Sequence, residues 1–275
     1  MSDNRPIGIF DSGLGGLTVL KAVQELLPNE SLVYFGDSGR TPYGTKSPET
    51  VLKYTFQDIN FLLEHDVKMI VIACNTASAC SLDAVLKQYT LPIVEVVGPG
   101  SRAAVRTSKT GRIGVIGTPA TVASGVYERA IQAAAARLTP DQPATYLGKA
   151  CPLFVPLVEE GWWDREVTAL TVREYMKPLQ EAGVDTVVLG CTHYPLLQSA
   201  IQKEMGEGVT LVNSALEVAR EVQAVLTERN IATGSDSTGS VSFFTSDSVE
   251  KFSELGSVFL GHPLENVTKI DIEAR

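Results

Sequence analysis

The stretch VVLGCTHYPLL, residues 187–197, places a thiol where a buried strand should end and a helix should begin. An apolar run and a glycine lead into Cys191, His193 follows two residues later, and Pro195 suits the first turn of a helix. A cysteine that follows an apolar run is usually just a small core residue. This stretch alone therefore leaves open whether the thiol is structural or chemical.

A second stretch, MIVIACNTASA (69–79), has the same layout and carries Cys74. Another pair of similar stretches is IGIFDSGLGGLTVL (7–20) and IGVIGTPATVASGV (113–126). Along the whole chain, short segments rich in Val and Ile alternate with longer segments of helical period, which is typical of parallel α/β units. We therefore predict an α/β fold of two similar, pseudo-symmetric lobes, each a mostly parallel sheet flanked by helices.

The periodicity also predicts where the elements and the lobes begin and end. The expected strands are 7–10, 32–35, 69–73, 93–97, 112–117, 186–190, 209–212 and 241–244. The expected helices are 16–27, 48–65, 77–88, 121–137, 164–182, 195–205 and 214–228. Glycine and proline interrupt the pattern in VVGPGS (96–101), where we expect the chain to pass from the first lobe to the second. A second crossing, back to the first lobe, is expected near residue 208. The first lobe is thus expected at 1–97 plus 209–275, and the second at 98–208.

Composition narrows the classes of function. With 44% hydrophobic and 20% charged residues, the chain has an ordinary globular balance, and no apolar run is long enough to predict a membrane partner. A net charge of −9 argues against a nucleic-acid partner. The four cysteines are too few for a disulfide scaffold, and without a C-x-x-C pair no metal site is expected. The first residues do not resemble a signal peptide, so we expect a cytoplasmic protein.

Both thiols are expected at the carboxyl end of a strand, where parallel sheets gather their ligands. The N–H groups of a following helix can lower the pKa of a thiol there and can hold an anion. Compact donors follow each cysteine, namely Asn75, Thr76, Thr192 and His193. The alternative is that Cys74 is a buried small hydrophobe and that His193 satisfies a local backbone group. Because Cys74 and Cys191 occur in matching contexts, a catalytic role is favoured for both. Cys80 and Cys151 are interpreted as packing residues.

Three further segments carry polar residues near predicted element ends. DSGLGG (11–16) has neither the spacing of a dinucleotide fingerprint nor that of a phosphate loop, and it offers Asp11 and Ser12 beside a close-approaching backbone. GDSGRTPYGTKS (36–47) contains a turn at Pro42, Tyr43 and Gly44. PLVEEGWW (156–163) places Glu159 near two tryptophans, which is also compatible with a helix end packed by aromatic rings.

Six motifs together resemble the glutamate racemases, the cofactor-independent branch of the aspartate/glutamate racemase superfamily. They are FDSGLGG, DSGRTPYG, ACNTASA, GTPAT, PLVEEG and GCTHYPLL. The resemblance implies two α/β lobes with the active site in the cleft between them, and interconversion of L- and D-glutamate without a cofactor. It also implies a role in supplying D-glutamate for peptidoglycan, and it makes a homodimer a common form of assembly.

The resemblance further implies a role for each matching residue. Cys74 and Cys191 would be the two bases, with Cys191 acting on the L-enantiomer, Asp11 assisting Cys74, and His193 assisting Cys191. Glu159 would be an additional acid near the second cysteine. The ammonium and α-carboxylate of the substrate would be held by Ser12, Asn75, Thr76 and Thr192. The distal carboxylate would be held by the turn of Pro42, Tyr43 and Gly44 with Thr118 or Thr121.

Physical chemistry makes these roles intelligible. Inverting a stereocentre through a planar carbanion needs one group that removes a proton and another, on the opposite face, that returns one. Three other readings remain open on the residues alone. They are a racemase of aspartate or another small acidic amino acid, a binding module without chemistry, and a thiol redox protein. The paired thiols argue against the binding module, and the lack of a second nearby cysteine disfavours the redox protein.

Overall fold

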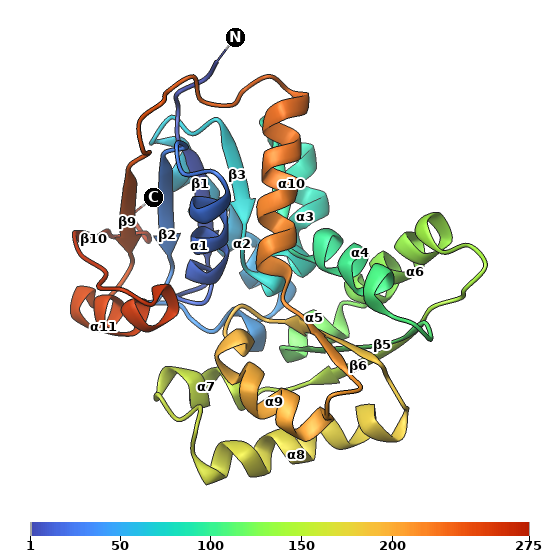
Figure 1. Cartoon of the computed structure of the whole chain (residues 1–275). Coiled ribbons are helices and arrows are strands. Elements are labelled where there is room, and N and C mark those ends of the chain that lie inside the picture. The colour runs from blue at the N-terminus through green and yellow to red at the C-terminus, as the bar shows by residue number, and fades with distance from the viewer. Residues whose placement is uncertain (1, 275) are drawn as a thin grey trace. The chain divides into compact units, whose positions relative to one another are not determined.

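A computed structural model describes residues 2–274, which form two compact units (Figure 1). Unit 1 comprises residues 2–96 and 215–274, and unit 2 comprises residues 97–214. Each unit contains one sheet, all of whose strand pairs are parallel, with helices packed around it. The predicted class, two similar α/β lobes with parallel sheets, is confirmed.

The sheet of unit 1 has the strand order β10-β9-β2-β1-β3-β4, and Figure 1 shows the C-terminal strands β9 and β10 in dark red at one edge. Its strands are β1 (Ile7–Asp11), β2 (Leu32–Gly36), β3 (Met69–Ile72), β4 (Ile93–Glu95), β9 (Val241–Thr245) and β10 (Val267–Lys269). Its helices are α1 (Leu17–Leu26), η1 (Tyr43–Thr45), α2 (Pro48–Leu63), α3 (Asn75–Gln88), α10 (Ser214–Glu228) and α11 (Val249–Leu260). Helix α2 packs against α3, and α1 packs against α11.

The sheet of unit 2 has the strand order β6-β5-β7-β8. Its strands are β5 (Arg112–Gly117), β6 (Thr145–Ala150), β7 (Thr186–Gly190) and β8 (Thr210–Val212). Its helices are α4 (Val97–Thr107), α5 (Pro119–Ala123), α6 (Val126–Leu138), α7 (Phe154–Glu159), α8 (Glu166–Glu181), η2 (Tyr194–Leu197) and α9 (Gln198–Met205). Helix α4 packs against α6 and against β7.

The two sheets repeat one arrangement of strands. The order β2-β1-β3-β4 in unit 1 corresponds, strand for strand, to β6-β5-β7-β8 in unit 2. In unit 1 Phe10 pairs with Ile72, and in unit 2 Gly117 pairs with Gly190. Ser12 and Thr118 therefore follow the first central strand of their sheets at the level where Cys74 and Cys191 follow the second. The repeat explains the similar sequence stretches at the four strand ends.

Local sequence accounts for the helix boundaries. Ser47 caps α2 by accepting a hydrogen bond from the N–H of Thr50 at 3.3 Å, and Pro48 occupies the first helical position. The expected helix at 121–137 is instead two helices, because Gly125 separates α5 from α6 with a φ of 65°. Residues with side chains rarely adopt that left-handed conformation, so the chain turns there.

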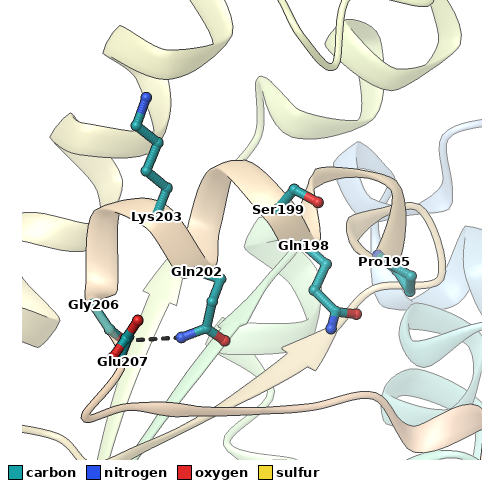
Figure 2. A pocket seen from close by; sticks show the side chains of 7 residues that line it. All are labelled: Pro195, Gln198, Ser199, Gln202, Lys203, Gly206 and Glu207. Atoms are coloured by element: carbon teal, nitrogen blue, oxygen red, sulfur yellow. Dashed lines mark hydrogen bonds between the residues drawn. The ribbon is translucent and has the colours of Figure 1, made fainter.

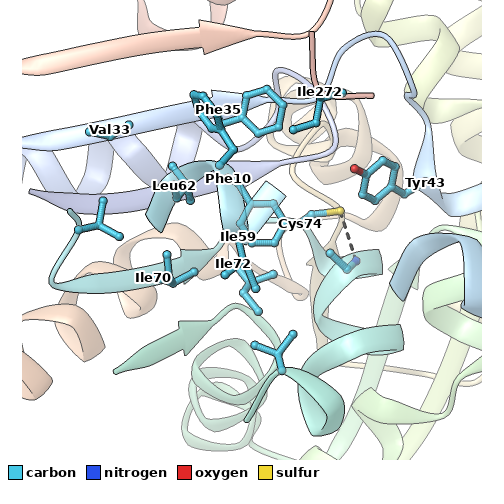
Figure 3. Close-up of a cluster of buried hydrophobic side chains, with 14 of the residues drawn as sticks. Phe10, Val33, Phe35, Tyr43, Ile59, Leu62, Ile70, Ile72, Cys74 and Ile272 are labelled. Atoms are coloured by element: carbon cyan, nitrogen blue, oxygen red, sulfur yellow. Dashed lines mark hydrogen bonds between the residues drawn. The ribbon is translucent and has the colours of Figure 1, made fainter. Parts of the chain in front are cut away.

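A cluster of buried side chains fills unit 1 between its sheet and helices α2 and α3 (Figure 3). The rings of Phe35 and Phe61 lie 4.9 Å apart at its centre. Full burial of such a side chain contributes about 1.5–3 kcal/mol. Cys74 and Tyr43 belong to the same cluster, so the candidate site residues of unit 1 rest directly on packed core.

The second crossing between units lies further along the chain than 208, the position expected from the sequence. The sequence pattern predicts residues 209–212 as part of the first lobe, but β8 pairs with β7 in the sheet of unit 2. The units change over between 214 and 215. This correction reflects tertiary pairing, because a short apolar strand carries no local signal of which sheet it joins.

Several elements lie outside the predicted ones, among them α4, β6, α7, α11 and β10. Helix α4 includes the glycine- and proline-containing stretch at 97–100, since a proline in the first turn removes no helical hydrogen bond. Strand β6 is only partly buried, so its apolar pattern is weak. Strand β10 and helix α11 belong to the C-terminal segment, where the sequence comparison between lobes offers no counterpart.

Candidate active site

Cys74 stands at the N-terminus of helix α3, two residues after β3 ends. Its sulfur accepts a hydrogen bond from the N–H of Ala77 at 3.4 Å, drawn as a dashed line in Figure 3, and thereby caps the helix. Its thiol donates to Oγ of Ser12 at 3.5 Å. Caps are usually Ser, Thr, Asp or Asn, so a cysteine here is an unusual choice on structural grounds.

The surroundings of Cys74 raise the pKa of its thiol, whereas the sequence predicted a lower one. Burial is the largest cause, and the negative charge of Asp11 adds to it. The hydrogen bonds with Ser12 and with the N–H of Ala77 act in the opposite direction but are weaker. Cys74 is therefore a protonated thiol at neutral pH, ready to donate its proton.

Asp11 ends strand β1 in a tightly closed loop. Its Oδ2 accepts from the N–H of Gly13 at 3.0 Å, and the carbonyl of Gly13 accepts from the hydroxyl of Tyr34, also at 3.0 Å. Gly16 leaves no room for a side chain, because a Cβ there would lie 2.5 Å from Cβ of Asp11 and 2.9 Å from the oxygen of Tyr34. The loop therefore holds the carboxylate of Asp11 and the hydroxyl of Ser12 close to Cys74.

In unit 2, Cys191 directly follows β7 and begins a chain of three polar side chains. Its sulfur lies 4.0 Å from Nδ1 of His193. On the other side of the imidazole, Nε2 lies 3.2 Å from Oε1 of Glu159. The sequence-predicted residues Cys191, His193 and Glu159 thus come together, although Glu159 is 34 positions from His193.

The environment raises the pKa of His193 to about 10. Burial alone would lower this pKa, but hydrogen bonds to Cys191 and Glu159 and the charges of both groups outweigh it. At neutral pH His193 is therefore an imidazolium, and both of its nitrogens carry a proton. Such a group stabilises a thiolate beside it and can return a proton to it.

Aromatic packing sets the position of Glu159. It is the last residue of α7, whose Phe154 meets the ring of Tyr194 edge-on at 5.1 Å. The hydroxyl of Tyr194 donates to the carbonyl of Cys151 at 3.0 Å. Because Tyr194 directly follows His193, both partners of the ion pair are attached to one aromatic cluster. The sequence did not single out Tyr194 or Phe154, since both read as ordinary core residues.

Thr118 and Thr121 lie at the end of β5, beside the strand that carries Cys191. Thr118 caps α5 by accepting from the N–H of Thr121 at 3.3 Å, and the two hydroxyls lie 2.9 Å apart. The remaining predicted residues with hydroxyl or amide side chains follow the ends of β3 and β7, and they are buried. They are Asn75 and Thr76 on α3, and Thr192 after Cys191.

The turn at Pro42, Tyr43 and Gly44 forms the start of η1. Tyr43 is fully buried, and its hydroxyl is hydrogen-bonded to Asp37 and, at 2.8 Å, to Oδ2 of Asp58. The hydroxyl of Tyr43 is therefore committed to the protein interior. Any contact of this turn with a substrate falls to the backbone, whose N–H groups at the start of a helix have no partner within that helix.

A pocket with a volume of about 680 Å³ lies along η2 and α9 (Figure 2). It is lined by Pro195, Gln198, Ser199, Gln202, Lys203, Gly206 and Glu207. None of the predicted site residues is among them. Gln202 spans one end of α9 by donating to the carbonyl of Gly206 at 2.8 Å, which gives this side chain a structural role.

Residues 2–274 show neither a metal-binding cluster nor a membrane-spanning helix. No group of three or more His, Cys, Asp or Glu side chains in this part of the chain is arranged to hold a metal ion. None of the helices described is both long and apolar enough to cross a membrane.

Comparison with known proteins identifies the family. The pattern of the Asp/Glu/Hydantoin racemase family matches residues 12–222. The chain therefore belongs to the aspartate/glutamate racemase family, as its motifs predict.

Individual relatives resemble the whole chain. It is 48% identical to a glutamate racemase of Geobacter metallireducens, over 98% of both chains. The crystal structure of a glutamate racemase isoform from Bacillus anthracis is similar with a TM-score of 0.91 and 38% identity, over 98% of both chains. That of the glutamate racemase from Francisella tularensis in complex with D-glutamate has a TM-score of 0.90 and 34% identity, covering 99% of this chain and all of that one.

Proposed function

We propose that this chain interconverts L-glutamate and D-glutamate without a cofactor, and that it thereby supplies D-glutamate for peptidoglycan. The observation that carries the proposal is the pair of cysteines at equivalent strand ends of two repeated sheets. Each thiol lies beside its own polar side chains, Ser12 and Asp11 in one unit, and His193 in the other. Similarity to glutamate racemases along nearly the whole chain supports the choice of substrate.

The reaction follows from two proton transfers at Cα. From L-glutamate, Cys191 as a thiolate takes the α-proton, and the electron pair of the broken C–H bond stays on carbon, delocalised into the carboxylate. Cys74 as a thiol then gives its proton to the opposite face. D-glutamate leaves, with Cys191 now a thiol and Cys74 a thiolate. The reverse reaction exchanges these roles, so each direction needs both thiols.

The charges around each thiol support these starting forms. The raised pKa of Cys74 keeps it a thiol, which is the form that donates to the carbanion. The imidazolium of His193 lies 4.0 Å from the sulfur of Cys191, so it can exchange a proton with this sulfur during turnover. The ammonium group of a bound amino acid would lower the pKa of a thiol beside it, which helps Cys74 to act as a base in the reverse direction.

The substrate would be held by donors at the strand ends. We assign the ammonium and α-carboxylate to Ser12, Asn75, Thr76 and Thr192, because the N-terminus of a helix such as α3 favours an anion. Stabilising the carboxylate also stabilises the carbanion that forms next to it. The distal carboxylate is assigned to the backbone N–H groups of Tyr43 and Gly44, with a hydroxyl of Thr118 or Thr121.

A cytoplasmic location and a homodimer complete the proposal. All four cysteines are free, and a reducing compartment would preserve them as thiols. The homodimer is an expectation from the family resemblance, and light scattering of the purified protein would test it.

Circular dichroism of the purified protein tests the activity. Incubated with L-glutamate and no added cofactor, it should remove the optical signal of glutamate, and it should leave that of L-aspartate largely unchanged. Loss of the aspartate signal alone would assign the enzyme to a different substrate. No change with either amino acid would reject the proposal.

Isotope exchange tests the two-base mechanism. Early in a reaction of L-glutamate in heavy water, the D-product should carry deuterium at Cα while the remaining substrate stays unlabelled. A single base that returns the proton it removed would leave protium in the product. Cys74→Ser and Cys191→Ser should each abolish turnover in both directions, whereas Cys80→Ser, a partly buried thiol on the same helix as Cys74, should retain most of it.

A further inference from the structure

A buried charged cluster in unit 1 surrounds the side chain of Tyr43, whose backbone is assigned to the distal carboxylate. It consists of Asp37 and Arg40 after β2, Tyr43 in η1, and Asp58 in α2. The side chains of Asp37 and Asp58 are fully buried, and that of Arg40 is 8% exposed. Charged residues are rarely buried to this extent unless they are paired, and the ion pairs and hydrogen bonds within the cluster offset its desolvation.

Arg40 uses its whole guanidinium to join the members of the cluster. Nε donates to Oδ2 of Asp37 at 2.6 Å, and Nη2 donates to Oδ1 of Asp58 at 3.1 Å. Nη1 donates to Gln57 at 2.7 Å, and the guanidinium lies 4.0 Å from the ring centre of Tyr54. This planar set of donors is specific to arginine, because lysine offers one point charge without the fork.

The hydroxyl of Tyr43 lies between the two carboxylates that Arg40 holds. It is hydrogen-bonded to Asp37 and to Asp58, while the ring of Tyr43 packs 5.4 Å from that of Tyr54. Tyr43 is also the first residue of η1. Because its side chain is fixed at both the ring and the hydroxyl, the direction of the backbone N–H groups at the start of η1 is determined by the cluster.

The cluster also ties this turn to the C-terminal part of unit 1. Ser246, which follows β9, donates to Oδ1 of Asp37 at 2.8 Å and accepts from the N–H of Gly39 at 2.9 Å. Glu273 accepts from Nη1 of Arg40 at 3.2 Å, and the neighbouring Ile272 is buried in the core. The turn is therefore supported from three separate parts of the sequence.

The segment between Arg40 and Tyr43 lies against the loop that carries Asp11 and Ser12. A Cβ on Gly13 would meet Oγ1 of Thr41 at 3.3 Å, so the two loops are in close contact. A displacement of the cluster would consequently move Ser12, which is assigned to the α-carbon end of the substrate, and the backbone of Tyr43, which is assigned to the distal carboxylate.

We propose that Asp37, Arg40 and Asp58 are positioning residues, which hold the hydroxyl of Tyr43 and so aim the backbone N–H groups of η1 at the distal carboxylate of the substrate. The inference rests on the proposed function, and it adds a determinant of selectivity for glutamate over its shorter homologue aspartate. The cluster selects by fixing where a distal carboxylate must lie, without touching the substrate itself.

Tyr43→Phe tests this role, because it removes only the hydroxyl that the cluster holds. We expect the KM for both enantiomers of glutamate to rise about tenfold and kcat to change less than threefold, since the one hydrogen bond that the hydroxyl donates to a buried carboxyl group is lost. The ratio of kcat/KM for glutamate to that for aspartate should fall by a similar factor. Tyr54→Phe is the matched control, because it removes a hydroxyl from the neighbouring ring and should leave KM unchanged.

A second variant separates positioning from simple loss of folding. Arg40→Lys keeps the positive charge but loses the fork, so it should raise KM in the same direction as Tyr43→Phe. A merely structural cluster would instead lower the unfolding temperature and the amount of active enzyme at an unchanged KM. Unchanged KM and unchanged selectivity in a folded Tyr43→Phe variant would overturn the inference. A wild-type protein that fails to racemise glutamate would overturn the proposed function as well.

Discussion

Glu159→Gln is the most informative single change in unit 2, because it keeps the size and a hydrogen-bond acceptor but removes the negative charge beside His193. The contact between Oε1 of Glu159 and Nε2 of His193 is 3.2 Å long, and His193 is almost fully buried. Hydrogen bonds to charged groups contribute about 1.5–3 kcal/mol and neutral ones about 0.5–1.5 kcal/mol, so roughly 1–1.5 kcal/mol is lost. Since one pKa unit corresponds to about 1.4 kcal/mol, the pKa of His193 should fall by about one unit.

The same change alters stability in a pH-dependent way. The pKa of His193 is raised to about 10 in the folded protein from 6.5, so the protonated imidazole stabilises the fold fully below pH 6.5. This contribution is lost as the pH rises through about 10. The variant should therefore be less stable than wild type by about 1–1.5 kcal/mol at pH 6, and the difference should vanish above pH 10.

Nuclear magnetic resonance of isotope-labelled histidine measures this pKa directly. The chain has only three histidines, His65, His193 and His262, and a His193→Asn variant identifies the signal of interest. Urea unfolding at several pH values measures the stability, and turnover should fall less in Glu159→Gln than in His193→Asn. Glu160→Gln is the matched control, because Glu160 is the exposed neighbour in sequence. A wild-type pKa near 6.5, or one that Glu159→Gln leaves unmoved, would refute the reasoning.

Two further changes test the loop that holds Asp11, and a third tests the hydrogen bonds that Asp185 accepts before the start of β7. Gly16→Ala would place a Cβ 2.5 Å from that of Asp11, so it should cost about 1–3 kcal/mol of stability and reduce kcat; an unchanged melting temperature would contradict this packing. Tyr34→Phe removes the hydrogen bond to the carbonyl of Gly13 and should lower stability by about 1 kcal/mol and slow turnover, which steady-state kinetics and thermal unfolding would measure. Burial raises the pKa of Asp185, but hydrogen bonds from Ser108 and Thr110 outweigh it and lower the pKa to about 2 from 3.8. Asp185→Asn should therefore lose up to about 2 kcal/mol above pH 4, with the difference shrinking as the pH falls to 2 in urea titrations.

The sequence was sufficient to predict the fold class and the places of both thiols. Apolar runs that end in Cys74 and Cys191 and continue into helical periodicity are local patterns, and they place each cysteine at the end of a strand in the structure. The repeat of strand order in the two sheets follows from the same internal similarity. Hydrophobic periodicity determines such features because it depends only on neighbouring residues.

Partners distant in the chain were decided by tertiary structure alone. Nothing near residue 210 shows that β8 joins β7, and nothing in DSGRTPYG shows that Arg40 meets Asp58 in the next helix and Glu273 near the C-terminus. The pKa of Cys74 is a similar case, since the helix N-terminus predicted a lower value and burial beside Asp11 produces a higher one. Burial and the pairing of charges depend on which segments pack together, so the protonation states of the site residues are a property of the folded chain. The positions of the two cysteines at strand ends, in contrast, can be predicted from the sequence.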